Sequence, residues 1–340
     1  GTTEIVRPRP DGIDIDADDH SRFSVLLRRA GVTRVILIHG TFAGDDIVGI
    51  VREISRFSPG VARQINALGK RWLDDLVGEF GNYTVSFAND LSKRINPPSS
   101  DPIDVSRFNW SGENHHLGRA DGAMSLLDSI LRDSGQQRIL VLAHSHGGNV
   151  VAMLSQIAGA SLSQRKALFH TTRLHYREPF IGRIDLNVWQ SVCERLCESE
   201  TVHIPPIDVV TFGTPLRYRW NRSVCPNLLN FVQHRPSVAG QPTRASLPNS
   251  IQDVLAAAGG DYVQQLGIAG TDFLPPIFAW RDWIVERRMC RMFESSARRR
   301  DVLKKMQLGR RESSDGVTLL VDYADTDDQA NRKLFGHGVY

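Results

Sequence analysis

The sequence predicts an α/β domain of three layers, in which a mostly parallel central sheet carries helices on both faces. Short apolar runs alternate with longer amphipathic stretches, as strands and helices do in such domains. The runs are rich in branched residues and hold few polar ones, which is typical of strands buried on both faces. The 340 residues are 41% hydrophobic and 23% charged, which is an ordinary globular composition.

Five apolar runs are the predicted strands of this sheet. They cover residues 35–38, 139–143, 207–212, 228–232 and 317–321. Helical periodicity fills the intervals between them. It is clearest at about 61–78, 119–133, 147–158 and 277–307.

We expect a single domain, because no internal repeat or low-complexity linker divides the chain. Residues 31–340 are assigned to the α/β domain and residues 1–30 to an extended N-terminal lead-in. The surplus length is placed in two insertions, at about 159–206 and 235–260. The first of these is expected to form a cap over a binding site or to pack a small core of its own.

The most informative stretch is the turn that follows the second apolar run. The sequence passes from ILVLA into His-Ser145-His-Gly147-Gly, and a helical pattern starts at once. This is the strand–turn–helix context of a GxSxG nucleophile elbow, with Ala143 in place of the first glycine. The turn must be tight, so larger side chains two residues before or after the serine would collide with neighbouring elements. Ser145 is therefore the predicted nucleophile.

The first apolar run ends in His39-Gly40 and predicts the second half of such a site. Acyl transfer develops negative charge on the carbonyl oxygen, and two fixed backbone N–H groups stabilise that charge. One predicted donor is His146, the residue after the nucleophile. The other is Thr41, with Phe42 as the alternative. We interpret His39 as a structural histidine that bonds this loop.

At these motifs the chain resembles the α/β-hydrolase superfamily, and its lipase and esterase branch in particular. The resemblance spans about residue 32 to the C-terminus and implies a hydrolase core with a cap insertion. It rests on VILIHGTFAG (35–44), ILVLAHSHGGNVVA (139–152), VVTFGTP (209–215) and FGHG (335–338).

The same resemblance implies where the base and the acid of a catalytic triad lie. The order in this superfamily is serine, acid, histidine, so the base is His337, in the loop after the last predicted strand. The acid follows the seventh core strand. If that strand is 228–232, the acid is Asp261. If it is 263–269, the acid is Asp272. The structural alternative for either aspartate is a turn cap.

These residues predict a serine hydrolase that cleaves carboxylic esters through an acyl-enzyme. Two alternatives stay open: an acyltransferase with the same triad, and a non-catalytic binding protein on the same fold. Phe42, Trp110 and Phe212 are predicted to line an apolar site for a small-molecule or lipid ester. We expect no cofactor and no metal, because HExxH and GxxxxGK[ST] motifs are missing from the sequence.

The charge of the chain is nearly balanced overall but unevenly distributed. A net charge of +3 is too small to imply a nucleic-acid partner. Residues 281–311, however, form a basic helical run, interpreted as peripheral contact with an anionic membrane surface or as the solvated face of an amphipathic helix. No apolar run is long enough to span a bilayer, and the first residues lack a signal-peptide core. We therefore expect a soluble protein, cytoplasmic by default, of open oligomeric state.

Overall fold

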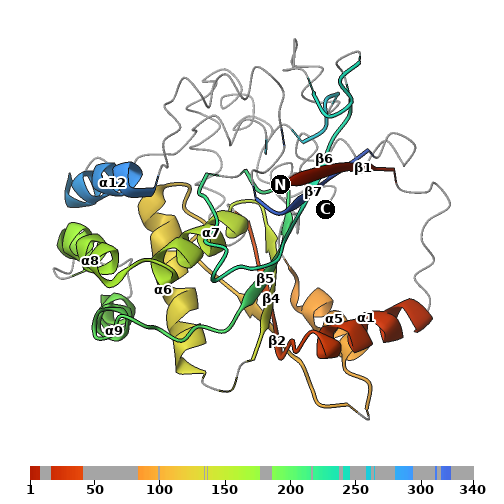
Figure 1. The fold of residues 1–340 in the computed structure, drawn as a ribbon, viewed down its shortest axis with the longest axis horizontal. Coiled ribbons are helices and arrows are strands. Elements are labelled where there is room, and N and C mark those ends of the chain that lie inside the picture. Colours follow the sequence, from red (N-terminus) through yellow and green to blue (C-terminus); the bar gives the residue numbers. More distant parts are fainter. Residues whose placement is uncertain are drawn as a thin grey trace, which may run out of the picture.

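The described part of the chain forms one sheet of seven strands, all parallel, with helices on both faces (Figure 1). The computed structural model describes residues 1–7, 17–40, 83–98, 100–133, 135, 137–176, 186–215, 217–236, 240–245, 258–261, 264, 280–293, 311 and 315–322. The strand order is β1-β7-β6-β5-β4-β2-β3. The predicted α/β class, with its parallel sheet, is confirmed.

The strands and helices alternate along most of the chain. The strands are β1 (Thr2–Val6), β2 (Arg34–Ile38), β3 (Asp104–Phe108), β4 (Ile139–His144), β5 (Ile207–Phe212), β6 (Leu228–Gln233) and β7 (Val317–Val321). The helices are α1 (Ala17–Arg29), α5 (Val85–Ile95), α6 (His116–Arg132), α7 (Gly147–Ala158), α8 (Leu162–Tyr176), α9 (Leu186–Cys197) and α12 (Trp280–Phe293).

Two hydrophobic cores lie on the two faces of the sheet. Successive side chains of a strand point to opposite faces. Accordingly, Ile36 and Ile38 of β2 enter the core on the α6–α7 side, whereas Val35 and Leu37 enter the core on the α1–α5 side (Figure 1). This division explains why the central strands are apolar at nearly every position.

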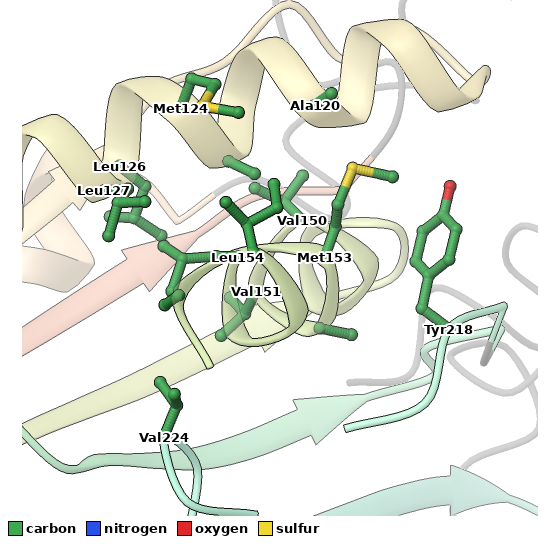
Figure 2. Close-up of a cluster of buried hydrophobic side chains, with 14 of the residues drawn as sticks. Ala120, Met124, Leu126, Leu127, Val150, Val151, Met153, Leu154, Tyr218 and Val224 are labelled. Atoms are coloured by element: carbon green, nitrogen blue, oxygen red, sulfur yellow. The ribbon is translucent and has the colours of Figure 1, made fainter. Parts of the chain in front are cut away.

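The larger core is centred on the contact between α6 and α7. Leu126 and Leu127 of α6 lie next to Val150 and Leu154 of α7, whereas Met124 lies on the side of α6 away from α7 (Figure 2). All five side chains are buried, and Val150 and Leu154 stand one turn apart on the same side of α7. Helix α7 is thereby held rigidly where it leaves β4.

Helices α8, α9 and α12 form an outer layer beyond α6 (Figure 1). The segment 159–206, expected to form a cap, supplies α8 and α9, which pack against α6, α12 and each other. Its aromatic residues meet inside this layer: Trp189 stacks on Tyr176 at 5.7 Å and meets Phe169 edge-on at 6.3 Å between ring centroids. These aromatic residues belong to the same hydrophobic cluster as the buried residues of α6 and α7, so the described part of the segment packs onto the main core.

The lead-in assigned to residues 1–30 was wrong, because this segment contributes to the sheet. Strand β1 pairs with β7 at one edge, and α1 covers one face together with α5. Strand β3, at the other edge, was also missed. Both edge strands are partly exposed and carry polar residues, so neither forms a continuous apolar run.

The other predicted elements agree with the structure where it describes them. The five predicted strands correspond to β2, β4, β5, β6 and β7 within one residue at each end. The predictions at 119–133 and 147–158 correspond to α6 and α7, and α12 occupies the first half of 277–307. The predicted helix at 61–78 lies outside the described residues. None of the described helices is both long enough and apolar enough to cross a bilayer.

A buried charge cluster ties the outer layer to α6. His175 of α8 donates from Nδ1 to Asp282 of α12 at 2.9 Å and from Nε2 to Asp121 of α6 at 3.2 Å. Since both ring nitrogens face carboxylate oxygens, the ring is an imidazolium that carries both protons. Burial alone would lower the pKa of His175, but the hydrogen bonds and charges of the two aspartates outweigh burial and raise it to about 9.

The stability of the protein is therefore expected to fall as the pH rises through about 9. The unfolded chain releases the His175 proton near 6.5, whereas the folded state holds it to about 9. The stabilisation is thus complete below pH 6.5 and is lost across this window, at about 1.4 kcal/mol for each pKa unit. Urea midpoints measured along a pH series for the parent and for His175→Gln test this. The variant should be less stable at the acid end and should show a shallower slope, because His115, whose pKa is also raised to about 9, keeps its share of the pH dependence. Equal slopes in both proteins would contradict the assignment.

Candidate active site

Ser145 lies between the two strands of the sheet, β2 and β4, from which the connections run to opposite sides. The connection that leaves β2 runs to β3 on one side, whereas the connection that leaves β4 runs to β5 on the other side. In open parallel sheets, ligands bind in the crevice at the carboxyl ends of such strands. The ends of β2 and β4 carry Gly40 and Ser145, respectively.

The backbone of Ser145 has an unusual conformation. Its φ of +50° makes it the only residue other than glycine with positive φ in the described part of the chain. This left-handed conformation costs about 1–2 kcal/mol for a residue with a Cβ atom. Three hydrogen bonds hold it: Ser145 N–H donates to Phe212 O at 2.8 Å, and Ser145 O accepts from Gly148 N at 3.1 Å and Thr214 Oγ1 at 2.8 Å.

The turn around Ser145 is too crowded for side chains at the neighbouring glycines. A Cβ atom on Gly147 would lie 2.5 Å from His39 O, and one on Gly40 would lie 2.7 Å from Ser145 Cβ and 3.4 Å from Ser145 Oγ. A Cβ atom on Gly148 would overlap Thr214. The expectation that only a small residue fits two positions after the serine is confirmed. Gly40 also places the end of β2 directly beside the hydroxyl.

His39 and Trp110 bind each other at the end of β2. His39 Nδ1 donates to Gly40 O at 2.7 Å, and His39 Nε2 accepts from Trp110 N at 3.2 Å. The indole of Trp110 donates in turn to His39 O at 3.0 Å. Burial lowers the pKa of His39, so the ring is the neutral tautomer that these bonds require. His39 is thus structural, as interpreted from the sequence, and the buried Trp110, predicted to line the substrate site, holds His39 at the end of β2.

A buried arginine lies behind the residue that follows the serine. His146 Nδ1 is 3.1 Å from Asn149 Nδ2 and 3.5 Å from Arg119 Nη1. Both neighbours are donors, so Nδ1 accepts and the imidazole proton lies on Nε2. Arg119 also donates from Nε to Tyr218 Oη at 2.8 Å and from Nη1 to Asn114 Oδ1 at 2.9 Å. A positive charge is therefore fixed, without solvent exposure, next to the His146 side chain.

The start of α6, from which Arg119 projects, is held by a carboxylate of α12. Glu286 accepts from His116 N at Oε1 and from Leu117 N at Oε2, both at 2.8 Å. His115, the residue before α6, places Nδ1 3.7 Å from Glu286 Oε2 and Nε2 3.4 Å from Glu113 Oε2. Neither Arg119 nor Glu286 was predicted from the sequence, because a charged residue in an amphipathic helix carries no local sign of burial.

Asp261 lies at the carboxyl end of β6. The residue before it, Gly260, pairs with His234 just after that strand, and Asp261 N–H donates to Gln233 O at 3.1 Å. Asp261 is fully buried, and its Oδ1 accepts from Gln264 N at 2.8 Å, as a turn cap does. Its carbonyl accepts from Arg311 Nη1 at 2.8 Å. The aspartate therefore follows the strand that the first sequence alternative required, two strands from β4.

The remaining predicted site residues are only partly accounted for. Phe212 is half-buried beside the serine, and its ring stacks on Phe231 at 5.4 Å between centroids. Thr41, Phe42, Asp272 and His337 lie outside the described residues. Among the residues that are described, no group of three or more histidine, cysteine, aspartate or glutamate side chains could hold a metal ion.

Comparisons of the chain with protein-family models, with curated proteins and with solved structures found no match. What the site can do is therefore argued from its geometry. A strained serine stands beside a glycine, between a buried strand and the positive end of a helix dipole. That arrangement suits a nucleophile whose reaction develops negative charge.

Proposed function

We propose that the protein is a serine hydrolase of carboxylic esters with an α/β-hydrolase fold. The observation that carries the proposal is the backbone of Ser145, held at φ +50° between β4 and α7. Strain of this kind persists only where surrounding contacts impose it, and it clusters at active sites. Support also comes from the parallel sheet, because the reversal of its strand connections, between β2 and β4, falls at the same serine.

In the proposed mechanism, Ser145 Oγ attacks the acyl carbon of the ester. His337 takes the hydroxyl proton and returns it to the departing alcohol, while Asp261, or Asp272 as the alternative, orients the imidazole. The backbone N–H groups of His146 and Thr41 stabilise the oxyanion. Water then attacks the acyl-enzyme and gives its proton to the same histidine, which returns it to Ser145 Oγ as the acyl–Oγ bond breaks and the acid leaves. An alcohol in place of water would give the acyltransferase alternative.

A fluorophosphonate probe read by intact mass tests the proposed nucleophile. The folded protein should gain one adduct, because an activated serine displaces fluoride from the probe and becomes phosphonylated, and peptide mapping should place that adduct on Ser145. Phenylmethylsulfonyl fluoride added first should block it. A folded protein that takes up no adduct, or an adduct on another serine, would contradict the proposal. A chain-length series of p-nitrophenyl esters, run with and without an added alcohol, then distinguishes lipase, esterase and acyltransferase.

A further inference from the structure

Helix α12 exposes a row of arginines on the outer layer of the protein, where it packs beside α8 (Figure 1). We call its exposed arginines, Arg287, Arg288 and Arg291, the outer basic face. The neighbouring helix α8 also exposes Lys166 and Arg173.

No acidic side chain of these two helices lies among the arginines of the outer basic face. Helix α8 has none, and each of the two in α12 is bonded to another helix. Asp282 accepts from His175, and Glu286 accepts from the first backbone N–H groups of α6. Surface helices commonly mix charges of both signs, which support each other at four-residue spacing. The outer basic face instead presents one sign.

Core packing does not account for this face. Val285, Met289 and Phe293 follow each other at four-residue intervals along α12 and are buried, so they form the apolar stripe that packs inward, beside the buried Glu286. The arginines lie on the opposite arc. The amphipathic-helix interpretation therefore explains one side of α12 and leaves the other side to be explained.

Two large apolar side chains are exposed on the same helix. Trp280 is 58% exposed and Met292 is 41% exposed. The Arg281 guanidinium lies over the Trp280 ring, 5.2 Å from its centroid. An indole ring gains free energy at the boundary between headgroups and acyl chains, and arginines beside it attract anionic headgroups.

We propose that the outer basic face docks the protein on an anionic phospholipid surface. The basic residues meet the headgroups, and Trp280 and Met292 enter the headgroup–acyl boundary, where their apolar surface leaves water. A nucleic-acid duplex would satisfy the arginines but would leave both apolar side chains in water. The proposal does not depend on the ester chemistry, so either can fail alone.

The test is flotation of the full chain with phospholipid vesicles. Vesicles with about 30% phosphatidylglycerol should bind the protein, and pure phosphatidylcholine vesicles should not. Binding should weaken strongly between about 50 mM and 500 mM NaCl, because salt screens the headgroup charge. The triple variant Arg287→Gln/Arg288→Gln/Arg291→Gln should bind about 100-fold more weakly, at about fivefold for each arginine. Trp280→Ser should also weaken binding, with the salt dependence retained.

A matched variant tests whether binding depends on the position of these arginines or only on the net charge of the protein. Lys93→Gln/Arg219→Gln/Arg222→Gln removes the same charge from exposed positions outside the outer basic face and should bind like the parent. Thermal melting confirms that each variant is folded. Three outcomes would overturn the proposal: no binding by the parent, equal loss in both triple variants, or tighter binding to duplex DNA than to the anionic vesicles at the same salt.

Discussion

Replacing Ser145 by alanine is expected to lower kcat/KM for ester hydrolysis by roughly 10⁴- to 10⁶-fold, the range typical of a lost serine nucleophile. The substitution deletes only Oγ. The backbone bonds to Phe212 O and Thr214 Oγ1 do not involve that atom, so the fold should be retained. Turnover of the best p-nitrophenyl ester, measured together with the urea midpoint, checks both statements. A kcat/KM within tenfold of the parent would exclude Ser145 as the nucleophile.

Ser145→Gly is the informative companion to the alanine variant. Both should be inactive, but glycine adopts positive φ without a Cβ clash, whereas alanine keeps the strain of the parent. We therefore expect the glycine variant to be more stable than the alanine variant by about 1 kcal/mol. The same urea titrations provide the comparison. A glycine variant less stable than the alanine variant would mean that the turn at φ +50° is not strained.

The parts of the fold that the sequence predicts are those whose surroundings are apolar on every side. Strands β2 and β4 have neighbours on both edges and helices on both faces, so burial appears directly as a run of branched residues. Strands β1 and β3 close the two edges and lack that signal. In β3, Asp104 is exposed and pairs with Arg34 at 3.1 Å, a contact that only the folded sheet brings together.

The site divides in the same way. Ser145 is predictable because the elbow is local: its strain and crowding are recorded in the small residues that flank it. The sequence leaves the role of Asp261 open, because an insertion separates this residue from β6. In the structure, the pairing of Gly260 with His234 brings Asp261 back to the end of β6. Arg119 is not predictable, because its burial depends on packing against residues far away in the chain.

Glu286→Ala is expected to produce the largest loss of stability, about 2–5 kcal/mol, because it leaves two buried backbone donors at the start of α6 without their acceptor. Glu286→Gln keeps one carbonyl oxygen and should lose less, about 1–2 kcal/mol. Arg287→Ala, one residue along on the exposed side, is the matched control and should change stability by about 0.5 kcal/mol or less. Urea unfolding of the three variants at neutral pH measures the differences. A Glu286→Ala protein as stable as the control would contradict the capping role.

The pH dependence of the Glu286 effect follows from its pKa. Burial alone would raise the pKa of Glu286, but the hydrogen bond with His115, the charges of His116 and His115, and the His116 backbone bond outweigh it and lower the pKa. A lowered folded-state pKa stabilises the protein above the unfolded value of 4.5, and this contribution is lost as the pH falls through the folded value. The difference in unfolding free energy between the parent and Glu286→Gln should therefore become smaller in acid. A difference that grows in acid would mean that the pKa of Glu286 is not lowered.

Loss of the Glu286 cap should also lower activity at the proposed active site. Arg119 lies in the first turn of α6, and its guanidinium contacts His146, whose backbone N–H is the proposed oxyanion donor. If that turn frays, Arg119 moves away and the residue after the serine loses a buried contact. Folded Glu286→Ala, assayed well below its melting temperature, should then show a lower kcat with little change in KM, since a weakened oxyanion site acts on the transition state more than on bound substrate. An unchanged kcat in the folded variant would confine Glu286 to stability.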